Sequence, residues 1–281
     1  MIKTKFLLIC ILLSSTCNQT IESKDYTIEN IFTDGIEGPA TDQDGNLYAV
    51  NYGEQGTIGI TTLGGHSSLF IKLPKGSIGN GIRFGKKKQM FVADYTQHNI
   101  LEINTETKKI SVYAHESEAN QPNDIAITPD NTLYASDPNW SNNTGNLWKI
   151  TKAKGFELLE SNMGTTNGIE VSPEADKLYV NESVQRKIWV YDITKKGFIE
   201  NKKELIHFKD FGLDGMRCDK NGNLFVCRYG KGTVAVVSPE GRLIKEIHLK
   251  GKNPTNLTFN KDYDKCYVTL ADRGCIEVIE L

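Results

Sequence analysis

Short runs of alternating apolar and polar residues recur along the chain from about residue 26 to its end. A period of two is typical of β-strands, and the runs are separated by turn-forming residues. No long stretch shows the 3.6-residue period of an amphipathic helix. The pattern therefore predicts an all-β protein.

One phrase recurs six times within this pattern. Each copy opens on a side chain that carries an oxygen atom, runs through an apolar alternation, turns, and ends in a second apolar run. The copies begin at Glu37, Asn80, Asn123, Asn167, Asp214 and Thr255, with separations of 43, 43, 44, 47 and 41 residues. A period in the forties with strand–turn–strand content is typical of a β-propeller.

Each unit divides into four short strands, except the sixth, which stops after three at the end of the chain. We expect residues 26–32, just before the first unit, to supply the missing strand and to close the ring without an open edge. The sequence thus predicts a single six-bladed β-propeller domain over residues 26–281, with its last blade closed by the N-terminal strand.

The first 17 residues have a different character. Two lysines precede an apolar run and a group of small residues that ends at Cys17. This is the layout of a bacterial export signal, and the apolar run is too short for a membrane-spanning helix. We expect an exported protein with a short linker over residues 18–25. Either Cys17 carries a lipid that anchors a periplasmic lipoprotein, or ordinary cleavage releases a soluble protein.

Composition narrows the class of partner. Of 281 residues, 24% are charged and the formal net charge is −2, so nothing indicates the basic face of a nucleic-acid-binding protein. Cys218, Cys227, Cys266 and Cys275 all lie in strand-like runs, where we expect buried thiols, although export would permit disulfides. Their spacing matches no zinc motif.

The six phrase-opening residues can be placed in the fold once a propeller is assumed. The first strand of each blade lines the central channel, so these residues should converge on the axis. Asn and Asp also suit turns before strands, which is the structural alternative. However, six oxygen-bearing side chains that include two carboxylates are what a hard divalent cation requires, and Ca²⁺ takes about six to eight oxygen ligands. Since no Cys or His opens a copy, zinc is not expected.

The sequence resembles the gluconolactonase and senescence marker protein (regucalcin) family. This family includes luciferin-regenerating-enzyme-like and diisopropyl-fluorophosphatase-like relatives. The resemblance covers about Tyr26 to Leu281. It rests on "EGP" at Glu37, "PND" at Pro122, "NGIEVSP" at Asn167, "LDGMRCDKNGNLFV" at Leu213 and "NPTNLTF" at Asn253.

The resemblance implies a divalent cation, in particular Ca²⁺, with Glu37, Asn123, Asn167 and Asp214 as its ligands. It also implies hydrolysis of a small-molecule lactone or ester, with Asp214 as the general base. The alternative role for Asp214 is metal ligation alone. By the same resemblance, Asn80 and Thr255 belong to the pocket wall.

The turns after the second strand of each blade should surround the site. Four residues of these turns are expected to contact substrate: Asp137, Trp140, Arg228 and Tyr229. Of these, Arg228 is expected to orient the polar end of the substrate. Gln121 is a fifth candidate, at a place where sugar-lactone members of the family usually have an arginine. Ile125, Ala40 and Thr41 also depart from the family pattern, so gluconolactone itself is not implied as the substrate.

A second class of function stays open at this stage. A non-catalytic propeller related to NHL-repeat domains could bind a ligand or protein, and the fold does not decide between the two. The axial carboxylates and amides discriminate, because a binding module does not need them. The five histidines do not open any copy, which counts against relatives that work through histidine.

Overall fold

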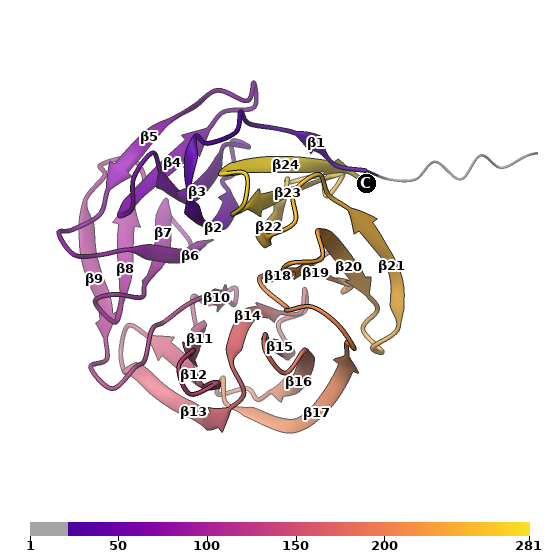
Figure 1. Cartoon of the computed structure of the whole chain (residues 1–281). Helices are drawn as coiled ribbons and strands as arrows, with labels where there is room; N and C mark the ends of the chain where they lie inside the picture. Colours follow the sequence, from indigo (N-terminus) through magenta and orange to yellow (C-terminus); the bar gives the residue numbers. More distant parts are fainter. Residues whose placement is uncertain (1–21) are drawn as a thin grey trace, which may run out of the picture.

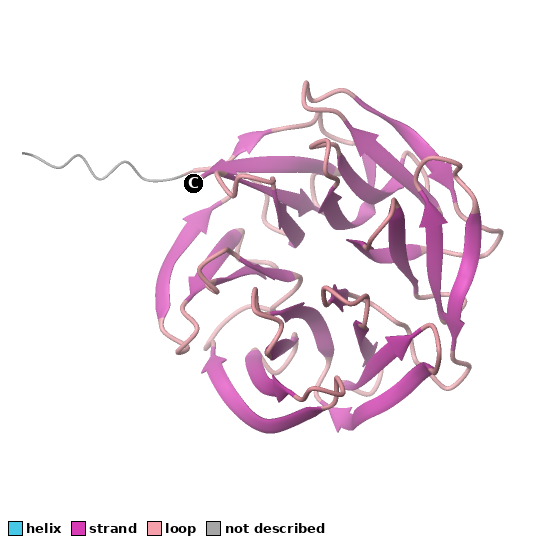
Figure 2. Ribbon diagram, turned by 180° about the vertical axis from the view of Figure 1, so that it is seen from behind, coloured by secondary structure: helices cyan, strands magenta, loops and turns pink. Residues whose placement is uncertain are grey.

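The computed structural model describes residues 22–281, and this part of the chain consists of strands and turns without a helix (Figure 2). The predicted export signal and Cys17 lie outside the described residues. Six four-stranded antiparallel sheets are arranged around a central axis as the blades of a propeller (Figure 1). The all-β, six-bladed prediction is confirmed. Within residues 22–281, nothing qualifies as a membrane-crossing helix.

Each blade begins with a strand next to the axis and ends with one at the rim of the ring (Figure 1). The first blade comprises β2 (Phe32–Thr41), β3 (Leu47–Tyr52), β4 (Thr57–Thr61) and β5 (Ser67–Lys72). The second comprises β6 (Gly79–Phe84), β7 (Gln89–Asp94), β8 (Asn99–Asn104) and β9 (Ile110–His115). The third comprises β10 (Ile125–Ile127), β11 (Leu133–Asn139), β12 (Thr144–Thr151) and β13 (Gly155–Met163).

The remaining blades repeat this order. The fourth comprises β14 (Thr166–Val171), β15 (Lys177–Glu182), β16 (Lys187–Ile193) and β17 (Ile199–His207). The fifth comprises β18 (Met216–Cys218), β19 (Leu224–Arg228), β20 (Thr233–Val237) and β21 (Leu243–His248). The sixth comprises β22 (Pro254–Phe259), β23 (Lys265–Leu270), β24 (Cys275–Glu280) and β1 (Lys24–Asp25).

The N-terminal segment closes the sixth blade, as predicted, but through earlier residues. Lys24 and Asp25 pair with Val278 and Glu277 of β24, whereas Phe32 already belongs to β2 of the first blade. The propeller therefore begins before residue 26, and the predicted linker over residues 18–25 is too long. The reason is that the segment after Asp25 turns over the end of the blade, with Phe32 N donating to the carbonyl of Gly274 at 3.0 Å.

The core lies between blades rather than at the axis. Each cluster of buried apolar side chains joins two neighbouring sheets; one, for example, packs Val50 and Ile58 of the first blade against Ile82 and Val92 of the second. The alternation along each strand sends its apolar side chains into these layers. All four cysteines of the propeller are free thiols in the strands, and three are buried. The axis is thus left for polar side chains.

Candidate metal site and substrate cavity

The six phrase-opening residues line one cavity of about 440 Å³ at one end of the central channel. Four of them lie where the pairing of the inner strand with its neighbour is interrupted, for instance between Phe32 and Ala40 in β2. Such irregularities change the direction in which side chains point from a strand. Asn123 and Asp214 lie two residues before the short strands β10 and β18. The predicted convergence on the axis is therefore present in the structure.

The residue after each phrase-opening residue controls how closely the inner strands approach. It is glycine in four copies but Asp124 and Asn256 in the third and sixth. A Cβ atom on Gly81 would come within 2.8 Å of Asp124 Oδ1, and one on Gly215 within 2.0 Å of Asn256 Cγ. The glycines thus provide the space that the two polar side chains fill. Sequence reasoning missed both residues, although their departure from glycine was a readable signal.

Two part-buried carboxylates line this cavity. Glu37 Oε2 accepts from the backbone N–H of Gly38 at 2.7 Å and from Asn256 Nδ2 at 3.0 Å. Asp214 Oδ1 accepts from Asn167 Nδ2 at 2.9 Å. Burial, reinforced by the negative charge of Asp124, raises the pKa of Glu37 to about 7. Burial and then repulsion from Glu37 raise the pKa of Asp214 well above its ordinary value. Without a cation the two carboxylates destabilise each other's charged form.

Amide oxygens complete the set of oxygen donors. Asn123 Oδ1 is buried and has no hydrogen-bond partner among the described residues. Asn167 uses its Nδ2 on Asp214, which leaves its Oδ1 as a further acceptor. Residues 22–281 contain no cluster of three or more His, Cys, Asp or Glu side chains spaced for a metal ion. Two carboxylates and two amides are instead the donor types of a Ca²⁺ site, so the residues present fit the expected cation.

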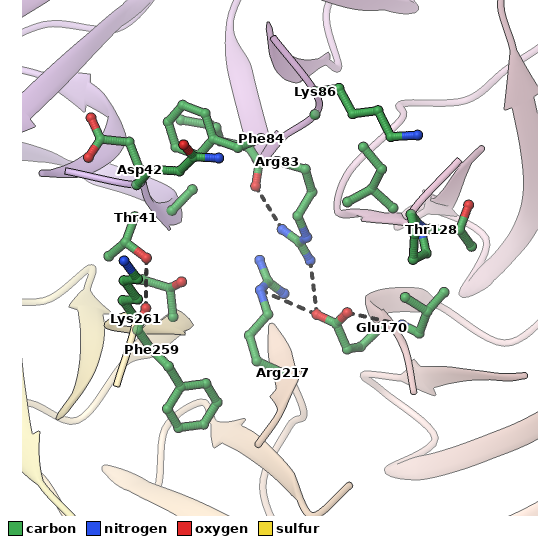
Figure 3. A pocket seen from close by; sticks show the side chains of 18 of the residues that line it. Thr41, Asp42, Arg83, Phe84, Lys86, Thr128, Glu170, Arg217, Phe259 and Lys261 are labelled. Atoms are coloured by element: carbon green, nitrogen blue, oxygen red, sulfur yellow. Dashed lines mark hydrogen bonds and ion pairs between the residues drawn. The ribbon is translucent and has the colours of Figure 1, made fainter. Parts of the chain in front are cut away.

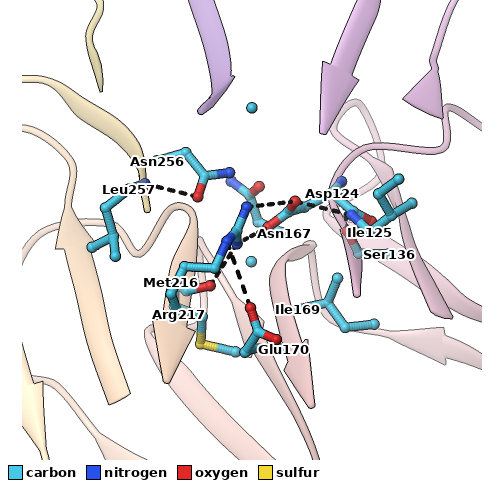
Figure 4. Close-up of polar contacts among 12 residues, drawn as sticks. Asp124, Ile125, Ser136, Asn167, Ile169, Glu170, Met216, Arg217, Asn256 and Leu257 are labelled. Carbon is cyan, nitrogen blue, oxygen red and sulfur yellow. Dashed lines mark hydrogen bonds and ion pairs between the residues drawn. The ribbon is translucent and has the colours of Figure 1, made fainter. Parts of the chain in front are cut away.

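Four charged side chains meet near the axis of the propeller, and Figure 4 shows three of them, Asp124, Glu170 and Arg217. Arg217 lies between Asp124, at 3.0 Å from Nη1 to Oδ2, and Glu170, at 3.5 Å from Nε to Oε2. Arg83 contacts the same two carboxylates, each at 3.4 Å. Although burial alone would raise it, Arg217 and Arg83 hold the pKa of Asp124 below its ordinary value. We call Arg83, Asp124, Glu170 and Arg217 the axial ion cluster.

The axial ion cluster was not anticipated. Arg83, Glu170 and Arg217 each stand three residues after a phrase-opening residue, where the other copies carry Ala40, Ala126 and Thr258. Charges at one position in three of six copies were a signal that these side chains meet. Their partners, however, come from different blades, and a single repeat does not show which blades face each other.

The rim of the cavity was predicted in part. Gln121, Trp140 and Tyr229 line it, together with Tyr95 and Gln55, which were not among the candidates. Thr255 is part of the wall, since its hydroxyl donates to the carbonyl of Ile36 at 2.8 Å. Contact of the rim residues with substrate stays a prediction, as do the ligand roles of Glu37, Asn123, Asn167 and Asp214.

Arg228 does not reach the cavity, and its predicted role as a substrate contact is wrong. Only 1% of the residue is exposed, and its guanidinium lies 4.0 Å from the ring centroid of Phe208. It donates to Asp210 Oδ1 at 2.7 Å and to Glu246 Oε1 at 3.0 Å. The residue that ends the second strand points into its own blade, and the next residue, Tyr229, reaches the cavity.

The predicted contact of Asp137 with substrate is wrong for the same reason. It is fully buried and accepts hydrogen bonds from the backbone N–H of Gln121 at 2.6 Å and from Trp148 Nε1 at 2.8 Å. Asn146 Nδ2 also donates to it, at 3.1 Å. Asp137 thus fixes the loop that carries Gln121, and it has no access to a substrate.

Comparisons with known proteins agree with this geometry. The sequence model of the SMP-30/Gluconolactonase/LRE-like region matches residues 30–272. A gluconolactonase of Zymomonas mobilis is 26% identical over 243 residues, which cover 74% of this chain and 68% of the relative. The diisopropyl-fluorophosphatase of Loligo vulgaris is 27% identical over 288 residues, with 89% and 91% covered.

Solved structures share the fold. A calcium-binding protein, regucalcin, from Agrobacterium tumefaciens superposes with a TM-score of 0.81 at 18% identity, over 92% of this chain and 94% of that one. A gluconolactonase of Xanthomonas campestris gives a TM-score of 0.79 at 16% identity, over 92% and 88% of the two chains. At these identities the superpositions establish the propeller architecture.

Proposed function

The chain belongs to the SMP-30/gluconolactonase/LRE-like family, and on this premise we propose that it hydrolyses lactones or related esters at a divalent cation, which we infer to be Ca²⁺. One observation carries the proposal: two part-buried carboxylates with raised pKa values and an amide oxygen without a partner among the described residues, Asn123 Oδ1, face the same cavity. A propeller that only binds a partner has no use for this arrangement. The expected export, with or without a lipid on Cys17, remains part of the proposal.

Residues of the cavity would take different roles in the hydrolysis. Glu37, Asn123, Asn167 and Asp214 would hold the cation, which when bound would polarise the carbonyl of the substrate. Asp214 would accept the proton of the attacking water, and its Oδ1 is oriented by Asn167 Nδ2 at 2.9 Å. Asn181 Nδ2 donates to the backbone carbonyl of Asp214 at 2.6 Å and fixes its position. These contacts pre-organise the base before a substrate arrives.

Removal of divalent cations tests the site directly. At pH 8 we expect a chelator to lower Tm by roughly 5–10 °C and to abolish hydrolysis, and Ca²⁺ to restore both. The pKa of Glu37 rises from an ordinary 4.5 to about 7 on folding, so the contribution of this group to the stability of the cation-free protein is full below about pH 4.5 and is lost as the pH rises through 7. The chelator effect should therefore be smaller at pH 5.

The matched control for this experiment is Glu37→Gln. It removes one of the two repelling carboxylates, so its melting temperature should respond little to chelator or to pH between 5 and 8. An unchanged wild-type melting curve after thorough chelation at pH 8 would remove the cation from the proposal.

The cavity also indicates the class of substrate. Its charged lining residues are Asp34, Glu37 and Asp214, and no Lys, Arg or His is among the described residues that line it. Trp140 and Tyr229 are 43% and 41% exposed at the rim. With a bound dication the lining still carries one negative charge in excess. We therefore infer a neutral substrate with a flat apolar group, in place of a substrate whose polar end is oriented by Arg228.

Substrate pairs measure this preference. A neutral aryl-substituted lactone should exceed its carboxylate-bearing analogue in kcat/KM by about tenfold or more, because no fixed cation offsets the repulsion. Trp140→Ala should raise KM for the aryl lactone by about tenfold and leave a small aliphatic lactone nearly unchanged. Phe198→Ala is the control, since Phe198 is equally exposed, at 43%, but does not line the cavity. Equal losses on both lactones would contradict an aromatic contact.

A further inference from the structure

The other end of the central channel opens into a second, larger cavity of about 990 Å³ (Figure 3). No residue lines both cavities. The axial ion cluster fills the channel between them, with Asp124 1% exposed and Arg217 6% exposed. Arg83, Glu170 and Arg217 form the floor of the second cavity, and the hairpins between the first and second strands of several blades form its rim (Figure 3). The cavity is therefore independent of the proposed catalytic site.

The two cavities carry opposite charge. The second is lined by six cationic side chains: Arg83, Lys86, Lys87, Lys88, Arg217 and Lys261. Against these stand Asp42, Asp44 and Glu170. Lys88 lies 3.8 Å from Asp44, while Lys86, Lys87 and Lys261 pair with no acidic side chain among residues 22–281. A concave surface with an excess of one charge concentrates ions of the opposite charge, which here are anions.

An aromatic wall stands beside these lysines. The rings of Phe259 and Tyr263 are stacked, with centroids 5.2 Å apart and an interplanar angle of 30°. Phe84 lines the same cavity. Tyr263 is 39% exposed, so part of its ring remains available to a ligand. Cations next to an exposed aromatic ring suit a molecule with an anionic group and a flat apolar part.

The backbone of Tyr263 adopts the conformation that is usual at this hairpin position. Its φ is +59°, in the left-handed region that bulky residues rarely adopt. The equivalent hairpin position is Gly45 in the first blade and Gly222 in the fifth, with φ of +85° and +82°. Each of the three donates its N–H to the carbonyl three residues earlier. Asn131 and Ala175 take this position in the third and fourth blades, with φ of +68° and +55°. The left-handed conformation therefore belongs to the hairpin, and in the sixth blade the residue that adopts it has its ring at the cavity.

We propose that this second cavity is a binding site for a small organic anion with a flat apolar group. The anionic group would lie near Lys87 and Lys261, above the guanidinium floor, and the apolar group against Tyr263. No step of the proposed hydrolysis uses any of these residues.

Anilinonaphthalene sulfonate is a suitable probe, and N-phenylnaphthylamine is its neutral counterpart. The probe should bind the Ca²⁺-loaded protein at one site, more tightly than the neutral compound, in a fluorescence titration. Lys87→Gln/Lys261→Gln should weaken the sulfonate by about tenfold and leave the neutral compound unchanged. Lys195→Gln/Lys196→Gln is the control, because these exposed lysines line neither cavity.

Tyr263→Gly separates the ring from the charges. Glycine suits a φ of +59°, so the variant should fold, and both compounds should bind about fivefold more weakly. Asn143→Gly makes the same backbone change at a position with φ of +53° that lines neither cavity, and should leave the neutral compound unaffected. Lactone hydrolysis should be unchanged in all variants and at saturating probe. Probe affinity that none of the substitutions alters, or competition between probe and lactone, would overturn the second site.

Discussion

Asp214→Asn should reduce kcat for lactone hydrolysis by roughly two to four orders of magnitude at saturating Ca²⁺, the usual contribution of a general base. The amide keeps an oxygen for the cation but cannot accept a proton. It also keeps the shape of the side chain, so the contact with Asn167 Nδ2, now at 2.9 Å from Oδ1, can persist. The measurement is kcat at several Ca²⁺ concentrations, with Ca²⁺ affinity determined separately by calorimetry.

The same experiment distinguishes a base from a ligand. If Asp214 only ligates the cation, activity should return to the wild-type level once Ca²⁺ is saturating, and the general-base role would be wrong. If Asp214 is the base, the loss persists, and the fall of wild-type kcat/KM at low pH disappears from the profile of the variant.

Asp34→Asn is the matched control for charge. Asp34 lines the same cavity but is exposed and is not one of the predicted ligands. The substitution removes the same unit of charge and should change kcat far less than Asp214→Asn. A loss of equal size in both variants would mean that the total charge of the cavity, and not a base at Asp214, governs the rate.

The architecture could be predicted because the repeat fixes it. Each copy places its first residue at the same point of the first strand, so the period alone brings Glu37, Asn123 and Asp214 to one cavity. The closing strand was placed two to seven residues too late, since Lys24–Asp25 form it. A two-residue strand of charged residues has no apolar alternation that would reveal it.

Side-chain direction at the strand ends could not be predicted in the same way. Arg228 and Tyr229 are neighbours in sequence, yet Arg228 pairs with Asp210 and Glu246 inside its blade while Tyr229 lines the cavity. The turn that begins there breaks the strict alternation of the strand, so the sequence does not say which of the two faces the axis. Partners from distant parts of the chain decide it, and these are visible only once the blades are assembled.

The axial ion cluster could not be predicted for the same reason. Asp124 and Arg217 are 93 positions apart and come from the third and fifth blades. Nothing in either repeat identifies the other as its partner. The cluster separates an acidic cavity from a basic one. Because it contains two arginines and two carboxylates, its four charges largely neutralise each other. Its contribution to stability can be measured.

Arg217→Met should lower the free energy of unfolding by about 3–5 kcal/mol, because among the described residues it leaves the buried carboxylate of Asp124 with Arg83, at 3.4 Å, as its only cationic partner. Lys177→Met provides the comparison. It breaks an ion pair of 2.5 Å between Lys177 and Asp192, whose side chains are 40% and 38% exposed, and should cost less than about 1 kcal/mol. Urea unfolding of the two variants at constant Ca²⁺ measures the difference.

A second substitution shows whether the cost arises from an uncompensated charge. In Arg217→Met/Asp124→Asn, no carboxylate is left unpaired at position 124, so the double variant should be more stable than the sum of the two single losses predicts, by about 1–3 kcal/mol. Simple additivity would mean that Arg217 stabilises the channel through packing alone. An Arg217→Met variant that loses no more stability than Lys177→Met would contradict the cluster as a structural element of the propeller.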